Sequence, residues 1–173
     1  MLEHVPIGQR NVAWRRIYAG IHRAESDALE DDLQDVWDRD DIPETTKDAL
    51  IKSRLGQGRF RARLEQRWGD CCAVTGCSIR QVLRASHIKR WADSTDAERL
   101  DPANGFLLIA NLDCLFDRGV ISFSDEGHML VSEVLSEGER QLPQVPESLR
   151  LPLNRHEIAY LAHHRDKYGF VDQ

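Results

Sequence analysis

The sequence predicts an α+β fold in which helices at both ends flank a centre of short strands and one short helix. Apolar residues recur at helical spacing in roughly the first seventy positions. From Cys72 onward the apolar runs become short and are separated by turn residues, which is typical of strands. Near the end, Asn154 precedes a pattern expected to form a closing helix over Arg155 to Tyr168. A chain of 173 residues is one domain, or one domain with an extension.

The N-terminal elements are expected to be helices. Residues 10–38 fit one or two helices, and Pro43 ends that segment. A further helix would begin at a threonine cap at 45 or 46 and stop near Leu55, because two glycines follow. Another helix would cover 59–68, where large apolar residues lie four apart.

The centre of the chain alternates between strand and turn patterns. Residues 72–83 indicate a β-hairpin around a Thr-Gly turn, and residues 91–104 a polar loop. A short strand is expected at 106–109, followed by a helix from a cap at Asn111 to about Asp117. A second hairpin would join 120–123 to 129–131.

The formal net charge of −6 is unevenly distributed. Residues 1–43 hold five arginines and ten acidic residues, which gives −5, and residues 44–173 give −1. Residues 52–90 hold ten basic and two acidic residues, which gives +8. Such a local basic face can neutralise phosphates even on an acidic protein, although a solvated helix face would have the same composition.

Four side chains suited to phosphodiester chemistry lie within about thirty residues. They are His87, Asn104, Asp113 and Asp117. One histidine, one amide and two carboxylates can supply a base for water and hold a divalent metal against a phosphate. This combination points to a nuclease.

Residues 56–123 resemble the HNH endonuclease family, whose core is the ββα-metal fold. Five elements occur in the family's order: RLGQGRFR from Arg54, CAVTG from Cys72, ASHIK from Ala85, DPANG from Asp101 and LFDRGVISF from Leu115. The closing YLAHHR also looks like the last helix of the restriction-type branch, so the resemblance covers about residues 45–170. The resemblance does not extend to residues 1–43.

The resemblance implies a role for each candidate. His87 would be the general base, and Asn104 would orient it or reach the metal. Asp113 stands where the family has its second histidine, a metal ligand, and Asp117 lies one helical turn further on. Carboxylates suit Mg²⁺ or Mn²⁺. The basic residues expected to contact nucleic acid are Arg59, Arg61, Arg63, Lys89 and Arg90.

Each assignment has a structural alternative. His87 could cap a hairpin, and Asn104 could serve as a turn former, since Asn-Gly favours turns. Asp117 could pair with Arg118 or Arg90. Ser86 stands where many nucleases of this fold have a metal ligand, and a hydroxyl is a poor one. A structural zinc is not expected, because the only cysteines, at 71, 72, 77 and 114, include neighbours that fit a tetrahedral site poorly.

We therefore expect a metal-dependent DNA endonuclease with low intrinsic sequence specificity, acting in restriction or antiviral defence. The alternative is an HNH-fold nucleic-acid-binding subunit that is inactive or gated by a partner. Residues 1–43 would be an acidic regulatory or dimerisation segment and residues 44–173 the nuclease domain, with a homodimer possible through the N-terminal helices. The absence of a long apolar run or signal pattern favours a cytoplasmic protein that does not enter membranes.

Overall fold

The computed structural model describes residues 34–36, 38–41, 43–133, 135 and 146–170. The expected helix over 10–38 lies outside these residues apart from 34–36, which are helical, and 38, which is in a turn. Between Gly58 and Arg59 the chain divides into two compact units, and the site described below belongs to the second, to which the long helix over 44–68 contributes its residues from Arg59 onward. Within the described residues, no helix is both long enough and apolar enough to cross a membrane.

A single helix replaces the two helices expected over 44–68. Helix α3 runs without interruption from Glu44 to Trp68. The prediction of a break at Gly56 and Gly58 was wrong, because an interior glycine costs only about 1 kcal/mol and packing can offset that cost. Three apolar side chains anchor the second half of the helix, since Phe60, Leu64 and Trp68 are all buried.

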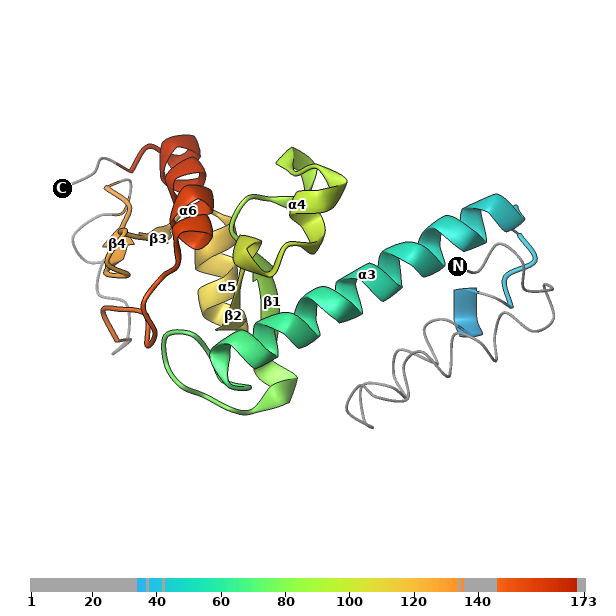
Figure 1. Cartoon of the computed structure of the whole chain (residues 1–173), viewed down its shortest axis with the longest axis horizontal. Coiled ribbons are helices and arrows are strands. Elements are labelled where there is room, and N and C mark those ends of the chain that lie inside the picture. The colour runs from blue at the N-terminus through green and yellow to red at the C-terminus, as the bar shows by residue number, and fades with distance from the viewer. Residues whose placement is uncertain (1–33, 37, 42, 134, 136–145, 171–173) are drawn as a thin grey trace. The chain divides into compact units, whose positions relative to one another are not determined.

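The centre of the second compact unit consists of two antiparallel strands and the helix that follows them (Figure 1). Strand β1 (Leu83–His87) pairs with β2 (Gly105–Ile109), and His87 lies opposite Gly105. Helix α5 (Ala110–Asp117) begins directly after β2 and packs against both strands. The expected α+β fold with a strand–strand–helix centre is confirmed.

The hairpin expected over 72–83 was wrong. The turn at Gly76 is present, with φ of 72°, but residues 72–82 contain no strand and the segment ends in the 3₁₀-helix η1 (Arg80–Val82). Its backbone bonds to distant partners instead. The amide of Ala73 donates to Leu107 O, and the carbonyl of Ala73 accepts from Arg150 N. Strand β1 therefore finds its partner beyond residue 100.

The expected polar loop at 91–104 contains three short helices. They are η2 (Trp91–Asp93), α4 (Asp96–Leu100) and η3 (Pro102–Asn104). Thr95 and Glu98 form a reciprocal capping box at the start of α4. This Thr-x-x-Glu pattern was the sequence signal that the prediction missed.

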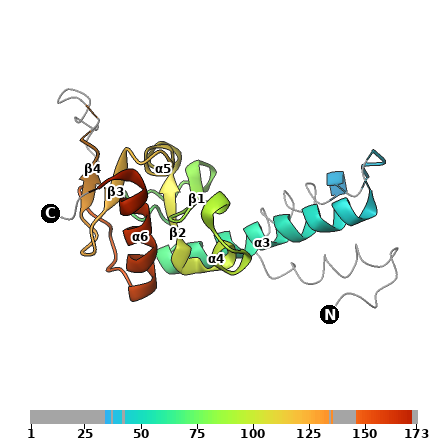
Figure 2. The same ribbon diagram turned by 90° about the horizontal axis from the view of Figure 1, so that it is seen from above.

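The second half of the unit follows the prediction. Strands β3 (Ile121–Phe123) and β4 (Met129–Val131) form an antiparallel pair. Helix α6 (Arg155–Tyr168) is capped by the Asn154 side chain and ends at Gly169, whose φ is 71°. Figure 2 shows α6 beside β3, and α6 also packs against η3, so it closes the unit over the segment that leads into β2.

Aromatic rings fill the centre of the core. Phe106 from β2 meets Trp68, Phe116 and Phe123, each with ring centroids 5.6 Å apart and edge-on. His164 from α6 stacks on Phe116 at 4.1 Å. The core therefore joins α3, β2, α5, β3 and α6 through one cluster.

We expect Gly119→Ala to destabilise the protein well beyond Gly69→Ala. Both glycines have φ near 66°, at 67° and 65°, so the backbone strain of about 1 kcal/mol is shared. A Cβ at Gly119 would lie 2.1 Å from the Tyr168 ring, whereas nothing lies within 4 Å at Gly69. Overpacking adds about 1–3 kcal/mol. Urea unfolding of the two variants measures the difference, and equal losses would contradict the packing at Gly119.

The free energy of unfolding should fall as the pH drops from 6.5 towards 4. His164 is buried, and its Nε2–H donates to Phe116 O while Nδ1 accepts from Ser122 Oγ. Burial lowers the pKa of His164 from 6.5 to about 4, so in this range the unfolded chain binds a proton that the folded chain does not. The loss reaches about 3 kcal/mol at the acidic end.

The matched comparison is His164→Gln, measured by denaturant unfolding at several pH values. This variant should show a shallower dependence on pH, whatever its absolute stability. The His87 imidazole also has a lowered pKa, but it is present in both proteins and cancels in the comparison. Identical slopes would show that His164 does not remain neutral in the folded protein.

Candidate active site

His87 lies at the end of β1 with its imidazole enclosed by two aromatic side chains. The ring stacks on Phe60 of α3, with centroids 4.1 Å apart and planes at 5°. The indole of Trp91 approaches edge-on at 5.6 Å. On the polar side, Nε2 lies 3.0 Å from the backbone carbonyl of Arg99. These contacts fix the orientation of the ring.

The Arg99 carbonyl also determines which ring nitrogen carries the proton. A carbonyl can only accept a hydrogen bond, so Nε2 must be the protonated nitrogen in the neutral ring. The lone pair is then on Nδ1. Burial lowers the pKa of His87, the bond to the Arg99 carbonyl raises it, and the Arg99 charge lowers it, with a net decrease. A neutral imidazole with a lone pair at Nδ1 can act as a proton acceptor.

Gly105 makes the stack possible. It lies opposite His87 in the sheet. A Cβ at this position would lie 2.4 Å from Phe60 Cζ and 3.0 Å from Leu64 and from the Ser86 carbonyl. Only glycine therefore lets α3 approach the strand closely enough for Phe60 to lie flat on the imidazole.

Asn104 is fully buried, and its carboxamide holds the segment after β1. Its Oδ1 accepts from Lys89 N at 2.7 Å. Its Nδ2 lies 3.2 Å from Lys89 O, 3.0 Å from Glu98 O and 3.3 Å from Ser94 Oγ. Glu98 directly precedes the residue whose carbonyl binds His87, so the Asn104 amide braces the support of the imidazole.

The two candidate metal ligands lie one turn apart on α5. The Asp117 carboxylate is 58% exposed and 3.8 Å from Arg90 Nε. Asp113 is half-buried, and its carboxylate makes no hydrogen bond or ion pair with other described residues. On β1, Ser86 lies opposite Phe106, whose ring meets Phe116 of α5, so Ser86 shares the face that α5 covers. The part of the chain described contains no group of three or more His, Cys, Asp or Glu placed to hold a metal.

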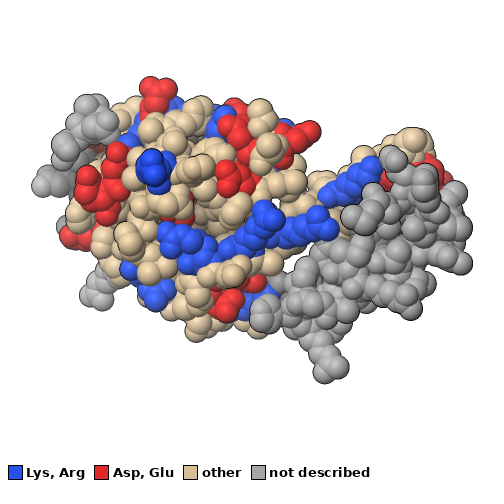
Figure 3. Space-filling model, in the orientation of Figure 1, with Lys and Arg blue, Asp and Glu red and all other residues tan. Residues whose placement is uncertain are grey.

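The five basic candidates differ in how exposed their side chains are and in whether those side chains are already bound within the protein. Arg59 and Arg63 are exposed on α3, one turn apart and flanking Phe60 along the helix. Arg61 donates to Glu65, at 3.1 Å, and to the carbonyl of Leu83, also at 3.1 Å. The band of Lys and Arg side chains along α3 is visible in Figure 3.

The two basic residues after β1 are each paired with a carboxylate. Lys89 Nζ lies 2.7 Å from Glu98, and its side chain is 19% exposed. Arg90 is paired with Asp117 and is 46% exposed. The expectation that Asp117 could pair with Arg90 is therefore confirmed.

The structure joins Asn104 directly to Lys89 by hydrogen bonds, and joins it to His87 indirectly, through Glu98, whose neighbour Arg99 binds the imidazole. Sequence reasoning missed the groups that hold the imidazole: Phe60, Trp91, Gly105 and the Arg99 carbonyl. Phe60 had been identified only as an apolar position of a helix. The sole signal for Trp91 was a large aromatic residue close to His87, and it is 37% exposed. A backbone carbonyl has no signature in the sequence.

The comparison with protein families agrees with this geometry. Residues 72–124 match the model of a family described as HNH endonuclease. The matched segment begins at the turn before β1 and extends just past β3, so it contains His87, Asn104, Asp113 and Asp117. A search of curated proteins found no match. The chain thus carries an HNH endonuclease domain at residues 72–124, and with it the phosphodiester hydrolase chemistry of that family.

Proposed function

We propose that this protein is a divalent-metal-dependent DNA endonuclease with low intrinsic sequence specificity. The observation that carries the proposal is the arrangement of His87. Its Nε2–H is committed to the Arg99 carbonyl, its lone pair is on Nδ1, and its ring is held by Phe60. Nδ1 of His87 has no hydrogen-bond partner among the described residues, whereas both ring nitrogens of the structural His164 are paired within the protein.

In this proposal Nδ1 of His87 takes a proton from the water that attacks the phosphorus. The imidazole becomes positively charged as the proton arrives. The Arg99 carbonyl, 3.0 Å from Nε2, bonds more strongly to the charged ring than to the neutral one. Asn104 keeps that carbonyl in place by binding the adjacent Glu98 O. It is therefore a positioning residue, because its own amide is used within the protein.

Asp113 and Asp117 would hold the metal, Mg²⁺ or Mn²⁺. Bound there, the ion would stabilise charge on the phosphate and on the departing 3′ oxygen. Their residue types and their one-turn separation on α5 fit a hard cation, and Asp113 has no competing partner among the described residues. Asn104 was expected as a third ligand, but its internal hydrogen bonds favour the positioning role. With Ser86 on the facing strand, water and phosphate oxygens would complete the shell.

The phosphate backbone would be bound by Arg59, Arg63, Lys89 and Arg90. The first two are exposed on α3 beside the residue that stacks on His87. Arg61 would have a structural role instead, because its guanidinium donates a hydrogen bond to the Leu83 carbonyl at the start of β1. Contacts of this kind follow the backbone and do not read bases, which is the basis for proposing low specificity.

The proposed setting is restriction or antiviral defence in the cytoplasm. The defence role rests on the resemblance to the restriction-type branch. The cytoplasmic location is supported by the four cysteines, which are all free thiols, as a reducing compartment would keep them. The acidic residues 1–43 would regulate the domain or allow two copies to associate, so that both strands could be cut.

A second candidate function is a nucleic-acid-binding module that does not cut, or that cuts only with a partner. Two observations favour it. Ser86 replaces a usual ligand, and Arg90 lies against Asp117. In this case the same basic residues would bind nucleic acid, and the metal side of the site would stay incomplete.

We expect His87→Ala to lower the cleavage rate of supercoiled plasmid at least about 100-fold in Mg²⁺ or Mn²⁺, since a general base contributes about 10²–10⁴. The matched control is His128→Ala, which removes an exposed histidine from the turn before β4 and should cut like the wild type. Equal cutting by all three proteins would show that another group acts as the base. If none cuts but DNA binding is retained, the second candidate function is favoured.

Asp113→Asn should raise the Mn²⁺ concentration needed for half-maximal cleavage about tenfold or more, because it removes a charged ligand without changing shape. The control is Asp166→Asn on the exposed face of α6. The metal titration is done at saturating DNA, so that a change in DNA affinity does not enter. If the requirement for metal is unchanged, Asp113 does not bind the ion.

A further inference from the structure

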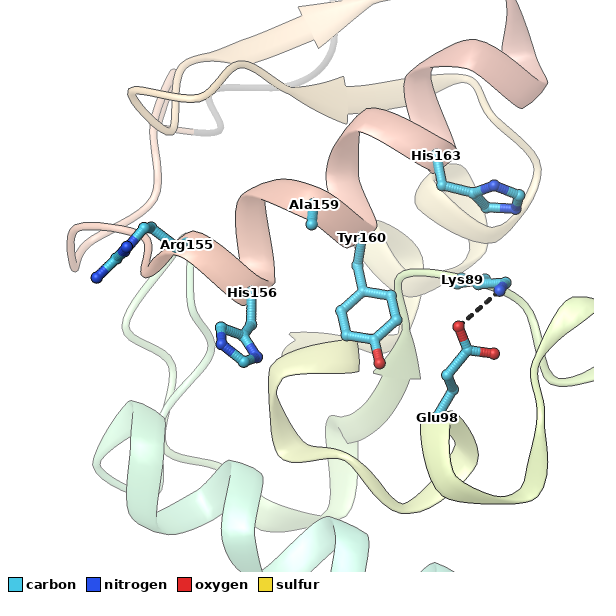
Figure 4. A pocket seen from close by; sticks show the side chains of 7 residues that line it. All are labelled: Lys89, Glu98, Arg155, His156, Ala159, Tyr160 and His163. Carbon is cyan, nitrogen blue, oxygen red and sulfur yellow. Dashed lines mark hydrogen bonds and ion pairs between the residues drawn. The ribbon is translucent and has the colours of Figure 1, made fainter.

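A pocket of about 430 Å³ lies between α6 and the segment that follows β1. Figure 4 shows His156 and Tyr160 projecting from α6 towards the segment that carries Lys89 and Glu98. Arg155 and His163 also line it. All the α6 residues in its wall lie outside 72–124, so the family match says nothing about them.

The pocket is open because of which residues α6 presents there. His156, Tyr160 and His163 recur at spacings of four and three, so they share one face of the helix. Ala159 on that face is too small to fill the space between the rings. The opposite face packs into the core through Leu161 and His164. On the pocket face, Tyr160 also helps to hold the helix through its contact with Asp101, whereas Arg155, His156 and Ala159 are exposed.

The polar groups around the pocket are mainly donors. Lys89 uses one of its three N–H bonds on Glu98. Arg155 is exposed and offers several more, and each imidazole offers at least one N–H even when neutral. The single carboxylate, Glu98, is already paired with Lys89. The Tyr160 hydroxyl donates to Asp101, so its ring forms an apolar wall.

We propose that this pocket binds a phosphodiester of the nucleic-acid strand that enters the active site. Donors from Lys89, Arg155, His156 and His163 would surround the phosphate oxygens. Lys89 is two residues from His87, so the backbone between them spans at most about 7 Å. This length is about the rise of two nucleotides along one strand of DNA. The proposal rests on the proposed function, because it extends the substrate path from His87 onto α6.

The test is equilibrium binding of a fluorescent 20-base-pair DNA duplex to the full chain, in EDTA so that no cleavage occurs. The pocket variant is Arg155→Ala with His156→Ala. The matched control is Arg150→Ala with His128→Ala, which removes the same two residue types from exposed positions outside the pocket. A third protein, His163→Glu, places a negative charge at the other end of the pocket.

We expect the pocket variant and His163→Glu to bind the duplex roughly fivefold or more weakly than the control at the same salt concentration. Removing one phosphate contact should also reduce the slope of log K against log salt by about one. Affinities and slopes equal to those of the control would overturn the proposal, and so would a wild type that binds no DNA.

Two further outcomes separate this proposal from related ones. Titration with inorganic phosphate distinguishes a strand subsite from a site for a free anion. If phosphate binds and the pocket variant abolishes that binding without weakening DNA binding, the strand proposal is wrong. The binding assay needs no cleavage. If the chain binds DNA through the pocket but cuts no plasmid, the pocket proposal stands and the proposed catalysis is wrong.

Discussion

The buried carboxamide of Asn104 is the constraint on which the rest of the site depends. Its oxygen and nitrogen bind Lys89 and Glu98, which are nine residues apart and belong to a segment with no strand. The bond to Lys89 N gives that amide its partner, and a buried amide left without one costs about 1–3 kcal/mol. The carbonyls of Glu98 and Lys89 also accept from Asp101 N and Ser94 Oγ, so there the Asn104 amide adds a second bond. The carbonyl that orients His87 belongs to the next residue. One side chain thus determines both where the segment folds and how the imidazole is held.

A second constraint joins the chemistry to the core. The stack of Phe60 on His87 requires close approach of α3 to the sheet, and Gly105 permits it because it has no Cβ. Phe60 and Leu64 belong to the same buried cluster as Phe106. The position of the imidazole is therefore supported by core packing as well as by hydrogen bonds.

The sequence was informative where structure is local and less so where it depends on distant partners. Asn154 and Gly169 mark the ends of α6 by local capping chemistry, and α6 was predicted correctly. The strand pairing was not predicted correctly, because seventeen residues separate β1 from its partner β2 and no local pattern indicates a partner at that distance. From the sequence, Asn104 was expected to orient His87 or reach the metal, with a turn as the alternative, and Gly105 to form part of that turn. The bonds of the buried Asn104 carboxamide and the close contact of Phe60 at Gly105 depend on tertiary neighbours, which no local pattern indicates.

The two sides of the site differ in how complete they are. On the side of His87, the groups that hold the imidazole are all in place: the Arg99 carbonyl, the Asn104 carboxamide that binds the neighbouring Glu98, and the Phe60 ring. On the α5 side, Asp113 has no described partner and Asp117 lies against Arg90. In the proposed nuclease, a phosphate that draws Arg90 away would free Asp117 for the metal, so substrate and ion would each favour binding of the other. Such coupling would keep the affinity for the ion low until DNA is present, and would thereby limit cleavage to the bound substrate.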